Sequence, residues 1–152
     1  MTQYHERLFP APTVFLATAL VIPASILVFF PISIVVGFVV AAVLYLGSTA
    51  LFLIMAPTVS IEDGVLRAGR ARIPVDQLGT PEVFVGEAAR AERGPNLNAR
   101  AYLLLNAWAH QAVRVPVLDE GDPTPYWLIS TRRAAELAAA ITSAAEERAA
   151  NV

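Results

Sequence analysis

The sequence predicts a membrane α+β protein, in which a hairpin of two apolar helices precedes a small β domain that ends in one helix. Two observations support this prediction. No charged residue occurs between Arg7 and Glu62, whereas residues 62–152 hold ten of the eleven basic residues, all of them arginine. Short alternating segments and then one helical pattern follow the uncharged block. A chain of this kind, 56% hydrophobic overall, is neither an ordinary soluble globule nor a disordered chain.

The composition also excludes several kinds of function. The chain has no cysteine, so it holds no disulfide, thiolate zinc site or cysteine nucleophile. A net charge of −2 gives no overall attraction for nucleic acid. The sequence contains no phosphate-cradling loop, dinucleotide fingerprint or zinc-ligand spacing. We therefore expect no nucleic-acid partner, no cofactor, no metal and no catalytic residue, and the protein is predicted not to be an enzyme.

The uncharged block is long enough for two membrane crossings. An α-helix rises about 1.5 Å per residue and the hydrocarbon core of a bilayer is about 30 Å thick, so roughly 20 residues span it. The block is about twice that length, and Pro31 marks the turn because proline cannot continue a helical hydrogen-bond ladder. The prediction is a transmembrane hairpin over residues 12–57, with helices at 12–30 and 33–56, a kink at Pro23 and a cap at Ser33.

The flanking arginines predict the orientation of this hairpin. Arg7 precedes the first helix, the turn between the helices is uncharged, and Arg67, Arg70 and Arg72 follow the second helix. Because positive residues favour the cytoplasmic side, both termini are expected in the cytoplasm, with residues 1–11 as a cytoplasmic tail. The protein is therefore predicted to cross the inner (plasma) membrane twice, with the lipid bilayer as its first partner.

Small residues on the second helix predict a close helix contact. Gly37 and Ala41 form a small-xxx-small pair, and Gly47 and Ser48 form a second small patch. The favoured interpretation is that these residues let the second helix pack on the first helix of the same chain. The alternative is a packing face for a partner helix.

The remaining residues, 58–152, are expected to form one small cytoplasmic domain. Turn signals such as Asp63-Gly64 separate short apolar or alternating segments. They predict seven strands and a short helix, at residues 58–61, 65–68, 71–75, 80–85, 101–106, 112–118 and 126–129, and at 87–93. A last helix over 131–148 follows the N-cap Ser130-Thr131 and buries a narrow, mostly alanine stripe. This order is that of a pleckstrin-homology-like fold, so a small antiparallel β barrel with a C-terminal helix is predicted.

Several segments of the chain carry a family resemblance. They are Tyr4–Leu8 (YHERL), Leu66–Pro74 (LRAGRARIP), Arg93–Pro95, Asn98–Leu103 and Asp122–Arg133 (DPTPYWLISTRR). With these segments, nearly the whole chain resembles an actinobacterial family of integral membrane proteins built around a domain of unknown function. The resemblance implies two membrane helices and a small cytoplasmic domain. It implies no activity, cofactor or catalytic residue.

The best candidate site is the start of the C-terminal helix, formed by Ser130, Thr131, Arg132 and Arg133. Free N–H groups at a helix start, two hydroxyls and two guanidiniums are the groups that bind phosphate or another anion. Arginine at a helix start is otherwise unfavourable, which calls for a bound anion or a carboxylate partner. The alternative is an ordinary cap whose arginines bridge to acids in the loop 119–122.

Other charged residues have simpler interpretations beside functional ones. Arg67, Arg70 and Arg72 can contact anionic lipid headgroups, and they also serve as the orientation signal. Arg93 and Arg100 can join the same basic surface, while Arg114 is expected in a solvated ion pair. His110 is expected to be structural rather than part of a triad with Ser130 and Asp119. The acidic run 119–122 is expected to be a solvated turn rather than a Ca²⁺ site.

Two classes of binding function and one enzymatic alternative follow. The first is a membrane-anchored, non-enzymatic interaction module at the cytoplasmic face, or an accessory subunit that binds a membrane-protein partner or a second copy of itself. The second is a module that binds an anionic lipid headgroup or a phosphate. The third, an enzyme of unrecognised type, has no motif in its favour.

Overall fold

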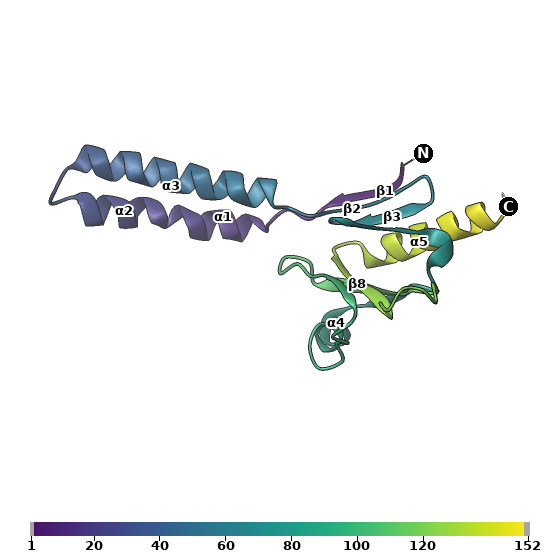
Figure 1. Cartoon of the computed structure of the whole chain (residues 1–152). Helices are drawn as coiled ribbons and strands as arrows, with labels where there is room; N and C mark the ends of the chain where they lie inside the picture. Colours follow the sequence, from purple (N-terminus) through teal and green to yellow (C-terminus); the bar gives the residue numbers. More distant parts are fainter. Residues whose placement is uncertain (1, 151–152) are drawn as a thin grey trace. The chain divides into compact units, whose positions relative to one another are not determined.

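The computed structural model describes residues 2–150, which form two compact units (Figure 1). The helical unit is the segment Phe9–Ala56. The other unit, which we call the β unit, combines the segment that ends at Leu8 with the segment that begins at Pro57. The helical unit is thus inserted between two parts of the chain that belong to one β unit.

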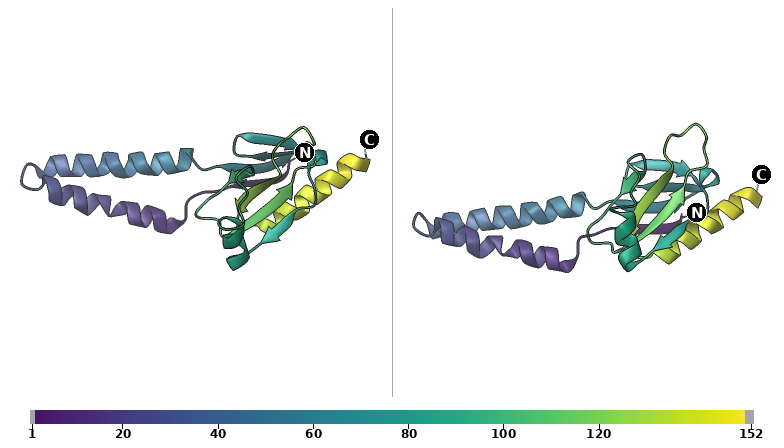
Figure 2. Two further views of the ribbon diagram at one scale, coloured as in Figure 1. Left: turned by 60° about the horizontal axis from the view of Figure 1, so that its bottom comes forward. Right: turned by 90° about the horizontal axis from the view of Figure 1, so that it is seen from below.

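Three helices make up the helical unit, all of whose residues are described: α1 (Pro12–Ala19), α2 (Val21–Phe29) and α3 (Ile34–Ile54). In all views α3 runs back beside the first two (Figures 1 and 2). The first arm is interrupted at Leu20, where a kinked but continuous helix was predicted. Pro23 explains the break, because its ring clashes with the carbonyl four residues earlier and it has no N–H to donate.

The turn between the arms lies where the proline predicted it. The N–H groups of Ile32 and Ser33 donate to the Phe29 carbonyl at 2.9 and 2.8 Å. Ser33 takes the N-cap position of α3 with an extended backbone, but its side chain makes no capping hydrogen bond. The predicted position of the cap is therefore confirmed, but the Ser33 hydroxyl does not form the hydrogen bond of a capping side chain.

Both arms of the hairpin are long and apolar enough to cross a membrane. Pro12–Phe29 has 18 residues and Ile34–Ile54 has 21. At about 1.5 Å per residue they extend about 27 Å and about 32 Å, close to the ~30 Å core of a bilayer. Their large side chains point outward: Leu16 is 74% exposed and Leu27 and Ile54 are each 77% exposed. An apolar surface of this size is unfavourable in water and suits contact with lipid.

α2 and α3 pack closely at a glycine. Gly37 and Ala41 are the buried residues of α3. A Cβ atom on Gly37 would lie 3.1 Å from the Ile26 Cα atom and 3.5 Å from the Phe29 Cβ atom, so a side chain there would push the helices apart. A Cβ atom on Gly47 would meet nothing within 4 Å. The Gly37–Ala41 pair therefore serves the packing within the chain that the sequence favoured, whereas the space around Gly47 is open.

Within the described residues, the β unit has eight strands in two four-stranded sheets. Sheet 1 is antiparallel and has the order β1 (Thr2–Arg7), β2 (Thr58–Glu62), β3 (Val65–Ala68) and β4 (Ala71–Pro74). Sheet 2 has the order β5 (Glu82–Phe84), β7 (Gln111–Pro116), β8 (Tyr126–Thr131) and β6 (Tyr102–Leu104). The helices are η1 (Val75–Gln77), α4 (Gly86–Glu92) and α5 (Ala134–Ala150). All seven predicted strands are present within a few residues of their predicted bounds.

Residues 2–7, which the sequence assigned to a tail at residues 1–11, form the eighth strand. β1 pairs antiparallel with β2, with Arg7 opposite Thr58. The Leu8 N–H also donates to the Pro57 carbonyl at 2.9 Å. Buried and exposed residues alternate along this strand, as they do in a half-buried strand. Its partner lies beyond the whole hairpin, so the local sequence could not reveal the pairing.

The two sheets do not close into the predicted barrel. A barrel needs ladder hydrogen bonds around its whole circumference, but β1 and β4 remain edges of sheet 1 and β5 and β6 remain edges of sheet 2. A further correction concerns β6, which pairs with β8 in parallel. α5, drawn in yellow, packs against strands of both sheets and covers their shared core instead (Figures 1 and 2).

The core explains why these segments form strands and a helix. Alternate residues of both sheets, among them Ile61, Leu66, Val113 and Ile129, pack with the inward stripe of α5, which contains Leu137 and Ile141. α4 packs on the other face of sheet 2, where Ala89 meets Ala112 and Leu128. β8 is therefore covered on both faces, and five of its six residues are buried.

The close approach at Gly37 makes a prediction for hairpin stability. Gly37→Val should lower the unfolding free energy by about 1–3 kcal/mol, because overpacking separates two helices that touch through backbone atoms. Gly47→Val is the matched control and should cause no loss, since open space surrounds that position. Unfolding of the full chain in mild detergent, followed by circular dichroism, measures both. Equal behaviour of the two variants would contradict the packing described here.

Candidate functional site

The structure separates the residues of the predicted anion site at the start of α5. Ser130 and Thr131 are both within β8 and fully buried, and α5 begins at Ala134 instead of residue 131. Adjacent strand residues point to opposite faces, so Thr131 faces the core shared with α5 and Ser130 faces the α4 side. The helix start is capped from another strand, since the Ala134 N–H donates to the Gln111 side-chain oxygen at 3.0 Å.

The carboxylate of Glu6 occupies the position where a bound anion was considered. Glu6 is buried, and it accepts hydrogen bonds from the Tyr4 hydroxyl at 2.8 Å and the Arg132 N–H at 3.1 Å. The Thr131 hydroxyl donates to the same carboxylate and accepts the Arg133 N–H at 3.0 Å. The N-terminal strand therefore supplies a carboxylate to the junction of β8 with α5, where it binds hydroxyls and the backbone N–H of Arg132.

Arg133 and Tyr4 complete this cluster. The Arg133 guanidinium lies 5.1 Å from the centre of the Tyr4 ring, donates to the His5 carbonyl at 2.9 Å and pairs with Glu136 at 3.1 Å. These partners replace the loop acids 119–122 that the alternative interpretation proposed. Burial, with a contribution from the Glu6 carboxylate, raises the pKa of Tyr4 to about 12, so its hydroxyl stays protonated and donates.

A basic face is formed by the other predicted arginines on the outer side of sheet 1. Arg67 on β3 lies directly opposite Arg72 on β4, and Arg70 occupies the turn between these strands. All three are exposed, and in the described part of the chain none of their side chains has a hydrogen bond or ion pair. Thr58 lies beside this turn, because the Gly69 N–H donates to its carbonyl at 2.9 Å. The structure thus brings the three arginines together at the end of sheet 1 that leads into the hairpin.

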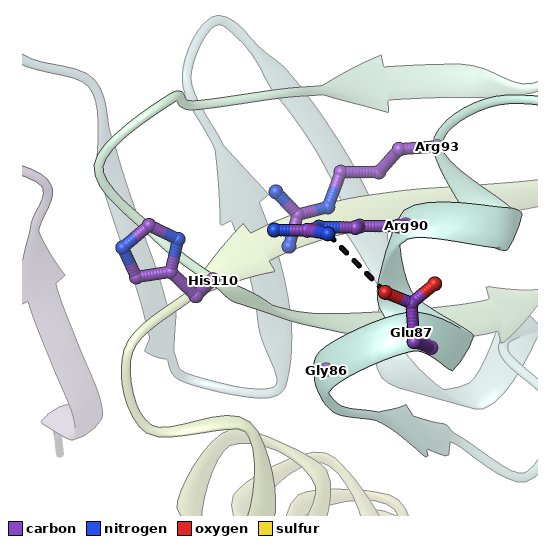
Figure 3. A pocket seen from close by; sticks show the side chains of 5 residues that line it. All are labelled: Gly86, Glu87, Arg90, Arg93 and His110. Atoms are coloured by element: carbon purple, nitrogen blue, oxygen red, sulfur yellow. Dashed lines mark hydrogen bonds and ion pairs between the residues drawn. The ribbon is translucent and has the colours of Figure 1, made fainter.

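A cavity of about 330 Å³ beside α4 is the candidate site that the sequence did not predict. It is lined by Gly86, Glu87, Arg90, Arg93 and His110. Figure 3 shows Arg90 of α4 and Arg93, at the C-cap of this helix, extending toward His110, which lies just before β7. The spacing of Glu87, Arg90 and Arg93 places them on one side of a helix, which was visible in the sequence. The approach of His110 depends on the packing of α4 on sheet 2 and was not visible.

The remaining charged candidates are structural. Arg114 pairs with Glu92 at 2.8 Å and with Glu82, and its guanidinium lies 5.1 Å from the Phe84 ring centre, so the predicted ion pair is partly buried. Asp119 accepts a hydrogen bond from the Gly121 N–H at 2.9 Å in a turn of the acidic loop.

Among residues 2–150, no group of three or more His, Asp or Glu side chains is arranged to hold a metal ion.

Comparison with known proteins gives one match. The model of a family described as a protein of unknown function (DUF3093) matches residues 3–141. No curated protein and no solved structure matches the chain. The resemblance to a family of unknown function is thereby confirmed, and the match assigns no activity to any residue.

The buried carboxylate makes a prediction for the β unit. Glu6→Ala should lower its unfolding free energy by about 3 kcal/mol, because the Thr131 hydroxyl and the Arg132 N–H lose their acceptor away from water. Glu136→Ala removes an exposed ion pair and should cost less than about 1 kcal/mol. Hydrogen exchange of β1 and β8 amides in the full chain measures both changes. Unchanged exchange in Glu6→Ala would show that the cluster does not hold β1 in place.

Proposed function

This chain belongs to the DUF3093 family of proteins of unknown function, and from its structure we propose that it is a non-enzymatic, membrane-anchored binding module. In this proposal the hairpin crosses the membrane twice and the β unit lies at the cytoplasmic face. The basic face formed by Arg67, Arg70 and Arg72 binds anionic headgroups of the same leaflet. The direct opposition of Arg67 and Arg72 on neighbouring strands, with neither side chain in an ion pair among the described residues, is the observation that carries the proposal.

The pairing of β1 with β2 supports a hairpin with both ends on one side of the membrane. One strand leads into the hairpin and the other leaves it, with Arg7 and Thr58 as paired residues. Strands that share hydrogen bonds cannot be on opposite sides of a bilayer. A hairpin that enters the membrane between these strands would therefore cross it an even number of times, and the two arms of membrane-spanning length fit this requirement. The arginines outside the hairpin and its uncharged turn favour the cytoplasm for the β unit.

The charge arrangement supports headgroup binding. Like charges directly opposite each other on neighbouring strands destabilise a sheet. Arg67 and Arg72 have this relation, and Arg70 adds a third positive charge in the adjoining turn. These residues lie at the sheet end from which both connections to the hairpin depart. Each basic residue near an anionic leaflet contributes about 1 kcal/mol of attraction, so phosphate groups of lipids can pair with these arginines.

Association with a membrane-protein partner or a second copy is the second candidate. The open space at Gly47 favours it, because small residues on membrane helices permit close packing of another helix. Gly37 is already covered by α2, whereas Gly47 is open to such a contact.

The absence of cysteine permits a direct test of topology. We expect a cysteine introduced as Ile32→Cys, in the hairpin turn, to react with a membrane-impermeant maleimide on intact cells. Glu120→Cys, in an exposed loop of the β unit, should react only after the cells are opened. Labelling of Glu120→Cys on intact cells would contradict the cytoplasmic assignment.

Headgroup binding is tested on the full chain in lipid nanodiscs. Amide exchange of β3 and β4 should be slower in discs that contain phosphatidylglycerol than in discs of phosphatidylcholine. High salt should remove the difference, because the Debye length falls to about 3 Å at 1 M. Arg67→Gln combined with Arg72→Gln should also remove it.

Arg100→Gln is the control, because Arg100 is exposed and belongs neither to β3 and β4 nor to the turn between them. This variant should keep the lipid-dependent protection of β3 and β4. If exchange in wild-type protein is the same in both lipids, headgroup binding by the basic face is wrong, whereas the topology can still hold.

A further inference from the structure

The cavity beside α4 concentrates positive charge without an equal number of carboxylates. Arg90, Arg93 and His110 line it together with Glu87 and Gly86 (Figure 3). Glu87 pairs with Arg90 at 3.2 Å, and this pair is well exposed, so it contributes little stability. No carboxylate pairs with Arg93 among residues 2–150. One guanidinium in the cavity therefore lacks a partner of opposite charge.

Arg93 is also incompletely hydrogen-bonded. Its Nε atom is buried and has no hydrogen-bond partner in the described part of the chain. Buried polar atoms without a partner are uncommon and call for an explanation. Burial, together with the nearby charge of Arg90, lowers the pKa of the Arg93 guanidinium. Both facts indicate that this side chain is held in a position that an anion would stabilise.

We propose that the cavity formed by Arg90, Arg93 and His110 binds a phosphate group, carried by a small solute or by a lipid headgroup. Guanidinium groups recognise phosphate through paired, charge-assisted N–H···O hydrogen bonds. The imidazole of His110 supplies a further donor on the facing side of the cavity. A volume of about 330 Å³ is at the small end of ligand pockets and leaves room for a phosphate with a short attached group.

This site is distinct from the basic face of sheet 1. α4 covers the face of sheet 2 that carries Ala112 and Leu128, whereas Arg67 and Arg72 belong to sheet 1. The proposal therefore does not depend on headgroup binding by the basic face, and the two can fail separately.

The two histidines of the chain provide a readout for each site. His110 lines the cavity and His5 lies on β1, where it pairs with Ser60, which in turn pairs with Arg67. We would record ¹⁵N spectra of the histidine-labelled full chain in phosphatidylcholine nanodiscs and assign the signals with His5→Gln. Inorganic phosphate is then titrated against chloride at equal ionic strength, and discs that contain phosphatidic acid form a second arm.

We expect a saturable shift of the His110 signal, with phosphate in solution if the ligand is a solute, or with phosphatidic acid alone if it is a headgroup. Arg93→Gln should weaken this binding about tenfold or more, since hydrogen bonds to charged groups are worth about that factor. Arg90→Gln changes an exposed residue, so it should weaken binding without affecting the fold. Arg100→Gln should bind as the wild type does.

The proposal is overturned if the His110 signal responds to neither phosphate source, or responds equally to chloride. It is also overturned if Arg93→Gln and Arg90→Gln both bind as the wild type does. A response of His5 to phosphatidic acid without one of His110 would favour the basic face and reject the cavity.

Discussion

The antiparallel pairing of β1 with β2 is the constraint on which the rest of the molecule depends. These strands flank the hairpin in sequence, and their ladder ends with Arg7 opposite Thr58. The pairing makes the helical unit an insertion within the β unit and brings both ends of the hairpin to one sheet. It also orders the assembly of the chain, because β1 is synthesised first but cannot find its partner until both arms of the hairpin have followed.

Glu6 ties this early strand to the last part of the chain. Its carboxylate accepts hydrogen bonds from Tyr4, Thr131 and the backbone of Arg132, so one buried charge satisfies donors from β1 and from the junction of β8 with α5. A buried carboxylate is unfavourable unless its oxygens are hydrogen-bonded. The three donors meet that requirement.

The arginines of the β unit lie in three different environments, and their roles differ accordingly. Arg133 and Arg114 have carboxylate partners and stabilise the fold. Arg67 and Arg72 lie opposite each other on the outer side of sheet 1, and neither is in an ion pair among the described residues. Arg93 directs a partly buried guanidinium into a cavity. Neighbouring carboxylates, rather than the number of arginines, therefore separate the structural residues from the candidates for binding.

The sequence by itself determined the order and character of the elements. The uncharged block specified two arms of membrane-spanning length, Pro31 the turn and Pro23 a kink, because these depend on local hydrogen bonding and hydrophobicity. The structure shows the kink as a full interruption between α1 and α2. The seven strands after the hairpin followed from alternation and turn residues in the same way. The close helix contact at Gly37 was also predictable from the sequence, since a small residue on a helix permits a neighbouring helix to approach.

The tertiary structure alone decided how distant segments meet. The six residues of β1 carry too little signal to reveal a partner beyond the hairpin. The sequence placed Ser130 and Thr131 in one site, but the extension of β8 through both turned their side chains to opposite faces. The same long-range packing supplied Glu6 to Thr131 and brought His110 to the arginines of α4. Local patterns determine elements, whereas a site depends on contacts between residues far apart in the chain.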